Sequence, residues 1–495
     1  MISFGLVRDI LFGKPLPPIP NVRLTKYDEL FPDGLTMGTL YIGRQGSGKT
    51  SSLARMVVDY AIRYPDRAIF SLDSSGSLTD TVLYLVMQQP KDIREKLLKR
   101  LVYDELGNSE WVIPMPEFSP DYGLNYEEQV QRVVKNLRKL AAHLVMNAPI
   151  LGDIAITETG AELFRLLCAI SNEHGENWQI TEAKKLLIDL GLLRTATNVF
   201  GFKVPESKWY FEREFLSSNV KGPERELRTY SLRAVLGVIE PREIRARLGY
   251  YRPGWTPKEA IRKGLIVLVS GENLINQEQT QHYLFTQVYS HILAEINTRS
   301  PDNSKDLPVM LVLDEVYSLI QIPGMADEVG KISPLYRSRK LELIIVIQAL
   351  WQLEKELREK IWSLGNVVCF ALHDMNEAYE VAQQLFKYEP QTVKIPSRSD
   401  SGQPIIEPDR GQYLSHANWV QGMANRQCVM RRYESESQPD KFIRFVQRTR
   451  NLPNGELDEP LEDIKEMLLQ ERGVRVRDAL DVINQRKIIR KPPQV

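Results

Sequence analysis

Short runs of consecutive apolar residues alternate with longer stretches of helical spacing along much of this chain. The clearest apolar runs lie at 39–42, 68–72, 264–270, 309–313, 343–347 and 367–372. A short apolar run between turn residues is typical of a buried strand. Strands of this kind that alternate with helices indicate a parallel sheet covered on both faces. We therefore predict an α/β fold with a mostly parallel central sheet.

Helical spacing follows the first apolar run and later dominates a long central region. Apolar residues repeat at helical intervals over 50–63, so a helix there should cross over between two parallel strands. From about 78 to 240 the pattern is mostly helical, most clearly at 126–146 and 161–170. We predict that this region is a helical insertion into the sheet-forming part of the chain.

These patterns divide the chain into five parts. They are an N-terminal segment with a proline-rich linker (1–35), a sheet-forming core in two pieces (36–77 and 241–385), a mostly helical insertion (78–240), a loop with edge strands (386–455) and a helical, basic tail (456–495). The linker is too rich in proline for a helix or a central strand. We expect the tail helix to break near Gly473.

The composition excludes several classes of protein. The chain has 64 Lys plus Arg and 64 Asp plus Glu, so binding to nucleic acid would depend on local patches. Its 3 cysteines are far apart, without a CxxC pair, which indicates a reducing compartment and neither a disulfide framework nor a zinc site. No run of about 18 apolar residues, enough to span a bilayer, is present. We expect a cytoplasmic protein without an integral membrane segment, at most peripheral at the membrane through partners.

A glycine-rich loop between the first strand and the first helix satisfies the pattern G-x-x-x-x-G-K-[ST]. Its residues are Gly43, Arg44, Gln45, Gly46, Ser47, Gly48, Lys49 and Thr50, followed by Ser51. The glycines let backbone N–H groups point at phosphate oxygens, and the following helix adds its dipole. Lys49 would reach the β- and γ-phosphates, and Thr50 would offer its hydroxyl to Mg²⁺. The loop therefore predicts a binding site for ATP and Mg²⁺.

Two acids end the strand predicted at 309–313. Asp314 and Glu315 would lie at the carboxyl edge of the sheet, where ligands of parallel sheets collect. Asp314 is suited to organise the Mg²⁺ shell, and Glu315 is suited to polarise the attacking water. Two adjacent carboxylates are costly unless a cation lies between them. Without the glycine-rich loop, a solvated strand end would explain them equally well.

Two further polar features flank the strand predicted at 343–347. Gln348 ends the strand, where an amide can contact the γ-phosphate or the water, although it could be an ordinary strand-end residue. Arg337 and Arg339 precede the strand. An arginine delivered to the transferring phosphoryl group, often by a neighbouring subunit, accelerates the reaction greatly. The pattern leaves open which arginine acts, and whether the segment is only a solvated basic loop.

The order of these motifs is similar to that of the HerA/FtsK superfamily of ring-forming motor ATPases. The order is a P-loop, a helical insertion, an Asp-Glu strand, an arginine, a strand ending in glutamine, and then Leu-Gly-Asn-Val at 364–367. Within this superfamily the chain most resembles coupling proteins of type IV secretion and conjugation, the TraG/TraD type. The resemblance covers roughly 36–385. It implies a RecA-like P-loop NTPase that forms a homohexamer, with ATP at the subunit interfaces and DNA in a central channel.

The same resemblance assigns roles to individual residues. They fall on Lys49 and Thr50 (nucleotide and Mg²⁺ ligands), Asp314 (metal-organising acid), Glu315 (catalytic base), Gln348 (sensor) and Arg337 (arginine finger). The helical insertion resembles the all-α domain of coupling proteins, which meets substrate complexes. The chain departs from the family at Tyr336, where glycine is usual, and it lacks the paired N-terminal transmembrane helices that anchor most coupling proteins.

Two clusters of basic residues are candidates for contact with DNA, with a solvated helix face as the alternative for each. The tail cluster is Arg472, Arg475, Arg477, Arg486, Lys487, Arg490 and Lys491, and the insertion cluster is Arg132, Lys135, Arg138 and Lys139.

We therefore expect a hexameric ATPase motor that translocates DNA in conjugation, mobile-element transfer or packaging. The alternatives are a ring ATPase that energises protein secretion or assembly, and an ATP-dependent switch in a nuclease-associated defence or repair complex. DNA and a relaxase, secretion or nuclease protein are the candidate partners.

Overall fold

A mostly parallel sheet forms the centre of the molecule. The computed structural model describes residues 37–144, 156–173, 178–303, 305–321, 325–386, 394–395, 405–406, 409–432, 443–448, 452–453 and 455–486. Within these residues the sheet has nine strands, in the order β12-β11-β8-β1-β7-β6-β2-β5-β3. Pairings from β8 to β3 are parallel, whereas β11 pairs antiparallel with both β8 and β12. The prediction of an α/β fold with a mostly parallel sheet is confirmed.

Six of the strands (β1, β2, β5, β6, β7 and β8) lie close to the bounds expected from the apolar runs, and β3, β11 and β12 complete the sheet. The strands of this sheet are β1 (Thr39–Ile42), β2 (Ala68–Asp73), β3 (Leu101–Glu105), β5 (Ile266–Ser270), β6 (Val309–Asp314), β7 (Leu341–Ile347), β8 (Asn366–Phe370), β11 (Gln427–Arg432) and β12 (Ile443–Arg448). Every residue of β1, β2, β6 and β7 is buried, as expected for strands covered on both faces. The expected N-terminal segment and its linker lie outside the described residues.

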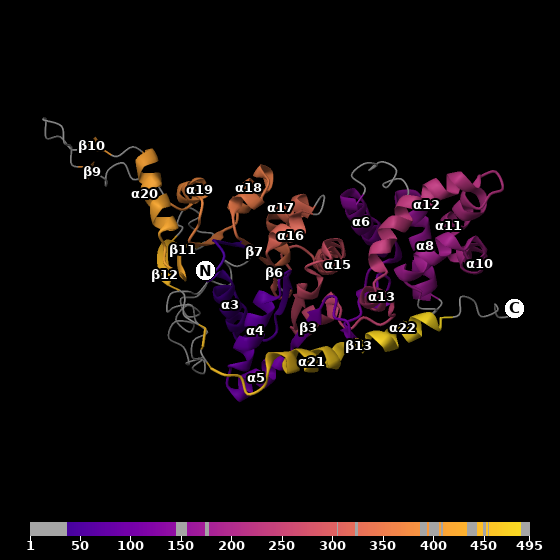
Figure 1. Cartoon of the computed structure of the whole chain (residues 1–495), viewed down its shortest axis with the longest axis horizontal. Coiled ribbons are helices and arrows are strands. Elements are labelled where there is room, and N and C mark those ends of the chain that lie inside the picture. The colour runs from indigo at the N-terminus through magenta and orange to yellow at the C-terminus, as the bar shows by residue number, and fades with distance from the viewer. Residues whose placement is uncertain are drawn as a thin grey trace.

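Helices connect the strands and cover the sheet (Figure 1). They are α3 (Lys49–Arg63), α4 (Ser77–Met87), α5 (Lys91–Leu98), α14 (Pro257–Lys263), α15 (Glu278–Asn297), α16 (Val316–Ile320), α17 (Met325–Tyr336), α18 (Lys355–Trp362), α19 (Met375–Leu385) and α20 (Asp409–Gln421). The two short strands β9 (Lys394–Ile395) and β10 (Ile405–Ile406) pair antiparallel apart from the main sheet. The crossover helix expected over 50–63 is α3.

One strand lies inside the segment that the sequence pattern indicated as a helical insertion. Leu101–Glu105 forms β3, which pairs with β5 and closes one edge of the central sheet. The pattern missed this strand because its end, Asp104-Glu105, is charged, and only the fold shows that Asp104 is fully buried. The helical part of the structure therefore begins after β3, not at residue 78.

The helical part forms the right-hand side of the molecule in Figure 1, beside the sheet. Its helices are α6 (Tyr126–Leu144), α8 (Ala161–Glu173), α9 (Ala183–Ile188), α10 (Leu190–Phe200), α11 (Pro205–Trp209), α12 (Gly222–Leu236) and α13 (Arg242–Gly249). The helices expected at 126–146 and 161–170 correspond to α6 and α8. Large side chains such as Trp178, Phe164 and Phe211 are buried here and extend the hydrophobic core away from the sheet.

The C-terminal segment runs along the lower edge in Figure 1 and connects the two parts of the molecule. It consists of α21 (Leu461–Arg472), β13 (Val474–Arg475) and α22 (Val476–Asn484), so the break expected at Gly473 is confirmed. At the core, Lys465 Nζ lies 2.8 Å from Asp80 Oδ1. In the middle, β13 pairs with β4 (Trp111–Val112). At the helical part, Arg486 lies 3.2 Å from Glu182.

A buried ion pair joins the edge strand β3 to α13. Arg247 donates to Asp104 through Nη1 at 2.6 Å and through Nη2 at 3.0 Å. Trp255 Nε1 donates to the same carboxylate at 3.0 Å, and Arg247 also donates to the carbonyl of Ile113 at 2.7 Å. Because both charged groups are buried and joined by two hydrogen bonds, neither can lose its partner without leaving an uncompensated charge.

We predict that Asp104→Ala destabilises the protein by about 3–5 kcal/mol, because it leaves the Arg247 guanidinium buried without its carboxylate. Chemical denaturation of the wild type and of Asp104→Ala measures the difference in the free energy of unfolding. The exposed pair between Glu224 and Arg228 is the matched control, and Glu224→Ala should cost at most about 0.5 kcal/mol. Equal effects from the two substitutions would contradict the role of the buried pair.

Candidate nucleotide-binding site

The glycine-rich loop lies between β1 and α3, at the carboxyl edge of the sheet. Gly48 is the N-cap of α3 and has a φ of 103°, a left-handed conformation that favours glycine. Gly43 lies so close to β8 that an added Cβ would be 2.6 Å from Phe370 Cβ. The loop therefore leads directly into the amino end of α3, where backbone N–H groups and the helix dipole favour an anion.

Neighbouring segments brace the loop from outside. Arg44 N–H donates to the carbonyl of Ala371, just after β8, at 2.8 Å. Arg426 N–H, in the turn between α20 and β11, donates to the carbonyl of Ser47 at 2.7 Å. The loop conformation therefore depends on strands that enter the sheet more than 300 residues later in the chain, as the positions of Ala371 and Arg426 show.

Lys49 lies on the loop itself. Its Nζ donates to the carbonyl of Gly43 and, at 3.0 Å, to the carbonyl of Arg44. Burial lowers the pKa of Lys49 to about 8, although Asp314 and Glu315 oppose the shift. A buried ammonium whose hydrogen-bond partners are two neutral carbonyls would be more stable beside a phosphate, because the phosphate carries a negative charge.

Two buried aspartates end adjacent strands. Asp73 of β2 is the register partner of Asp314 of β6, so their side chains lie on the same face of the sheet. Asp73 accepts hydrogen bonds from the N–H groups of Ser75, Gly76 and Thr79 at 3.1, 3.0 and 2.8 Å.

Burial, followed by repulsion from Asp73 and Glu315, raises the pKa of Asp314 to about 8. The pKa of Asp73 is also raised by burial, but its N–H donors favour the charged form. We therefore assign the negative charge of this pair to Asp73 and the proton to Asp314 when no cation is bound.

Glu315 is held between two polar side chains. Its Oε1 accepts from Gln348 Nε2 at 3.0 Å, and its Oε2 accepts from Ser74 Oγ at 3.2 Å. Glu315 also has a φ of 50°, a rare conformation for a residue with a side chain. The structure thus brings Glu315 and Gln348 into contact, as their strand-end positions indicated.

The residues at this edge fit a divalent cation. Asp314 and Asp73 are buried neighbours whose mutual repulsion a cation would relieve. Ser47 Oγ, on the loop, is buried without a hydrogen-bond partner in the described residues. Carboxylate and hydroxyl oxygens are the ligands that Mg²⁺ prefers.

The two candidate arginines lie at the opposite edge of the sheet, before β7. Arg339 Nη1 donates to the carbonyl of Asn297 at 2.7 Å and to its side-chain oxygen at 2.5 Å, so this guanidinium is held within the subunit. Arg337 is exposed. Because β7 has seven residues and spans roughly 20 Å, neither arginine can serve the glycine-rich loop of its own subunit.

Three residues at the site did not figure among the predicted site residues. Asp73 and Ser74 follow a predicted strand, so the argument that selected Asp314 could have found them. Arg426 carries no signal in the sequence, because only the packing of β11 beside β8 brings it to the loop.

Half of the insertion cluster is buried and paired within the fold. Arg132 and Lys139 are buried, with Arg132 Nη2 3.7 Å from the Glu117 carboxylate. Lys135 and Lys139 lie 2.6 and 2.8 Å from Glu328 of α17. Arg132 and Lys139 are therefore unavailable to DNA, whereas Lys135 and Arg138 are exposed, as the solvated-face alternative expected.

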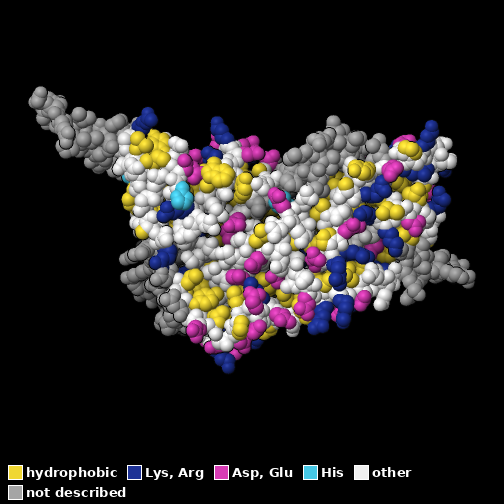
Figure 2. Space-filling model, viewed as in Figure 1, with side chains coloured by type: hydrophobic (Ala, Val, Ile, Leu, Met, Phe, Trp, Pro, Cys, Tyr) yellow, Lys and Arg dark blue, Asp and Glu magenta, His cyan; other side chains and the backbone are white. Residues whose placement is uncertain are grey.

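The tail cluster is partly engaged within the fold as well. Arg472 lies 3.4 Å from Glu259, and Arg486 lies 3.2 Å from Glu182. Lys487, Arg490 and Lys491 lie outside the described residues. On the face shown in Figure 2, basic and acidic side chains are interspersed, with more Lys and Arg over the helical part.

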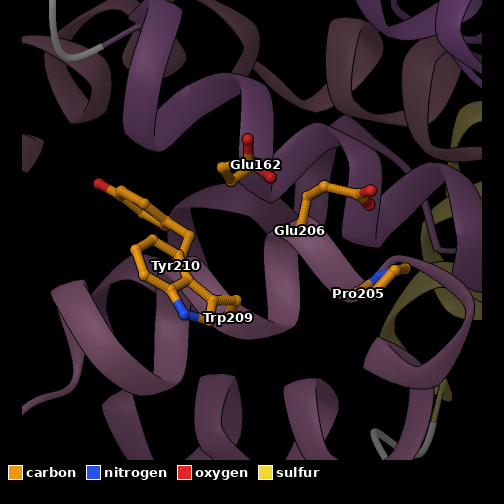
Figure 3. A pocket seen from close by; sticks show the side chains of 5 residues that line it. All are labelled: Glu162, Pro205, Glu206, Trp209 and Tyr210. Carbon is orange, nitrogen blue, oxygen red and sulfur yellow. The ribbon is translucent and has the colours of Figure 1, made fainter.

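An open pocket of about 430 Å³ lies in the helical part, away from the glycine-rich loop (Figure 3). It is lined by Glu162, Pro205, Glu206, Trp209 and Tyr210. The carboxylate of Glu162 is already occupied, since it accepts from Ser207 Oγ at 2.7 Å and from Arg165.

A family model matches a segment that includes the later part of the sheet-forming core. Residues 308–426 match the family described as the TraM recognition site of TraD and TraG. This segment is therefore similar to that domain of TraD and TraG. It contains Asp314, Glu315, Arg337, Gln348 and Arg426, so the expected resemblance to TraG/TraD-type coupling ATPases is confirmed.

Two solved structures share the fold of this chain. The bacterial conjugative coupling protein TrwBdeltaN70, in an unbound monoclinic form, has a TM-score of 0.51 at 12% identity, over 87% of this chain and 89% of that chain. The plasmid coupling protein TrwB, in complex with a non-hydrolysable GTP analogue, has a TM-score of 0.52 at 13% identity, over 93% and 95%. The expected RecA-like fold is thereby confirmed.

No curated protein matches the chain. Among the residues that the structure describes, none of the helices combines the length and the apolar character needed to cross a bilayer.

The pKa of Asp314 predicts a pH dependence of stability. In the folded protein this pKa is about 8, above the ordinary 3.8, so the folded state keeps a proton that the unfolded state releases. Stability without Mg²⁺ should therefore fall as the pH rises from about 4 to about 8. Asp314→Asn removes this effect, and in EDTA it should melt above the wild type at pH 8.

This gain from Asp314→Asn should shrink as the pH is lowered toward 5, which thermal melts at several pH values would measure. Asp121→Asn, at an exposed position, is the control and should show no such trend. A gain that stays constant with pH would contradict the assignment of the proton to Asp314.

Proposed function

We propose that this protein is an ATP-hydrolysing ring motor that translocates DNA, of the type used in conjugation, mobile-element transfer or packaging. The observation that carries the proposal is the placement of the polar residues. Lys49, Asp314, Glu315 and Gln348 gather at one edge of the sheet, whereas Arg337 is exposed at the other. The TraG/TraD-type domain at 308–426 supports the conjugation class.

The loop residues Gly43 to Ser51 would bind the phosphates of ATP. Lys49 would leave the carbonyls of Gly43 and Arg44 and bind the β- and γ-phosphates instead. Thr50 and Asp314 would hold Mg²⁺, with Asp73 contributing its charge nearby. The metal would supply neutralisation of the charge that develops on the phosphates.

Glu315 would act as the base that orients and deprotonates the attacking water. Its two oxygens are held by Gln348 and Ser74, so the carboxylate has a defined direction. A γ-phosphate that attracts the amide of Gln348 would loosen one of these hydrogen bonds. The pair would thereby link the state of the nucleotide to β7, which leads back to Arg337.

Arg337 would act in a neighbouring subunit. It cannot reach its own loop across β7, yet phosphoryl transfer gains most from a guanidinium placed at the developing charge. An exposed arginine at the opposite edge meets this need in a closed ring, and the resemblance to coupling proteins favours a homohexamer. Arg339 is the weaker candidate because Asn297 holds it.

A protein substrate is the second candidate, and one observation favours it. Much of the basic charge that could meet DNA is paired within the subunit, at Glu328, Glu259 and Glu182. The matching family is described by recognition of TraM, and a partner protein could bind here in the same way.

A measurement of ATP hydrolysis with and without DNA tests the proposed function. We expect DNA to stimulate hydrolysis and the protein to displace a streptavidin block from the end of biotinylated DNA. Lys49→Ala should abolish nucleotide binding, whereas Glu315→Gln should bind ATP but hydrolyse it at least about 100-fold more slowly. Hydrolysis that ignores DNA but responds to a partner protein would favour the second candidate, and wild-type turnover in Glu315→Gln would remove Glu315 as the base.

Mixed rings test the trans role of Arg337. Neither Arg337→Ala nor Lys49→Ala should hydrolyse ATP alone, but a mixture creates interfaces with an intact Lys49 and an intact Arg337. We expect the mixture to recover part of the activity, with a maximum near equal amounts, because only such interfaces are complete. Arg339→Ala, mixed in the same way, is the control and should not show this complementation. No recovery at any ratio would argue that Arg337 does not act between subunits.

A further inference from the structure

Arg426 touches the glycine-rich loop from a distant part of the chain. Its N–H donates to the carbonyl of Ser47 at 2.7 Å. Its side chain starts directly over Gly48, since a Cβ added to Gly48 would lie 2.7 Å from Arg426 Cγ and 3.2 Å from its Cα. Gly48 is the N-cap of α3, so the arginine lies beside the helix end that attracts anions.

The turn that carries Arg426 is held in place by several hydrogen bonds. Gln427 N–H donates to the carbonyl of Ala424 at 2.9 Å, and Ala424 N–H donates to Gln427 Oε1 at 3.1 Å. Gln421, at the end of α20, donates to the carbonyl of His373 at 2.6 Å. The backbone of Arg426 is thus positioned by its own turn and by the loop after β8.

The backbone of Arg426 is in an unfavourable conformation. In the described residues, four positions other than glycine have a positive φ: Asp302, Glu315, Lys340 and Arg426. Glu315 belongs to the nucleotide site, and Asp302 and Lys340 bind the turn at 337–340 through backbone hydrogen bonds. Strain of this kind costs roughly 1–3 kcal/mol and gathers at functional sites. Arg426 has a φ of 68° and is the fourth of these positions, the one that neither of these explanations covers.

Glycine would satisfy the backbone at this position better than arginine does. The hydrogen bond to Ser47 uses only the backbone, so the guanidinium is what arginine adds. No hydrogen bond, ion pair or ring contact within the described residues engages the Arg426 side chain, which is half-buried. A guanidinium next to a phosphate-binding loop and without a protein partner is suited to an anionic ligand.

We propose that Arg426 binds the phosphate chain of the nucleotide in the same subunit. This inference rests on the proposed nucleotide-binding function. Arg426 is the last residue of the TraG/TraD-type domain, and β11 begins at the next position, so nucleotide binding would attach the antiparallel edge of the sheet to the loop. Arg426 acts in binding rather than in the chemical step, since its contact with the phosphates is present before and during the reaction.

Two substitutions at Arg426 separate the guanidinium from the backbone. Arg426→Gly suits the positive φ, keeps the N–H to Ser47 and removes the side chain, whereas Arg426→Lys keeps a positive charge. Arg410→Ala, an exposed position on α20, is the control for the loss of one charge. Binding of ATP, ADP and adenosine to each full-length protein is measured by calorimetry, together with the kcat and KM of ATP hydrolysis.

We expect Arg426→Gly to weaken the binding of ATP and ADP about ten-fold or more, the range of a charge-assisted hydrogen bond. KM should rise with little change in kcat, Arg426→Lys should recover at least about three-fold of the loss, and Arg410→Ala should bind like the wild type. Affinity within about two-fold of the wild type in Arg426→Gly would overturn the inference. An equal loss for adenosine, or no recovery in Arg426→Lys, would also overturn it.

Different results would overturn the proposed function and the role of Arg426. If the wild type binds no nucleotide, the proposed function itself is wrong. If the wild type binds ATP and Lys49→Ala does not, the proposed function stands and the result for Arg426 decides this inference alone.

Discussion

The site depends on the register of the parallel strands. Thr39 to Ile42 of β1 pairs with Ile344 to Ile347 of β7, so the glycine-rich loop and Gln348 leave the sheet at the same level. On the other side of β7, the pairing of β2 with β6 places Asp73 beside Asp314. A one-residue slip between β2 and β6 would turn one of these carboxylates to the opposite face of the sheet, and a slip between β1 and β7 would do the same to Gln348. The buried apolar residues of these strands set the register, and the polar residues at their ends follow.

The charged groups at this edge of the sheet are not fully neutralised by partners within the described part of the protein. Lys49 is buried and its hydrogen-bond partners are carbonyls, and Asp314 keeps a proton because it is buried and because Asp73 and Glu315 are near. A nucleotide with Mg²⁺ would correct both, since the phosphates pair with the lysine and the cation pairs with the aspartates. Binding of such a ligand would therefore be favoured, because it would lower the energetic cost of burying these charged groups.

The charges elsewhere are used to hold the parts of the molecule together. Arg247 and Asp104 join β3 to α13, and Arg486 joins the end of α22 to Glu182 in the helical part. Lys135 and Lys139 of α6 meet Glu328 of α17, the helix that precedes Arg337. The helical part thus contacts the helix that leads to Arg337.

The sequence by itself determined the features that depend on local order. A buried strand needs an unbroken apolar run, and a phosphate loop needs glycines, a lysine and a hydroxyl at fixed spacing, so β1, β6, β7 and the residues from Gly43 to Thr50 could be predicted. The tertiary structure decided the features that depend on neighbours far apart in the chain. It buried Asp104 and so made β3 a sheet strand, it paired the basic cluster of α6 with acids, and it placed Arg426 on the loop. A sequence pattern predicts that a charged side chain is exposed to solvent. Only the packing of the folded chain shows which charged side chains are buried beside a partner.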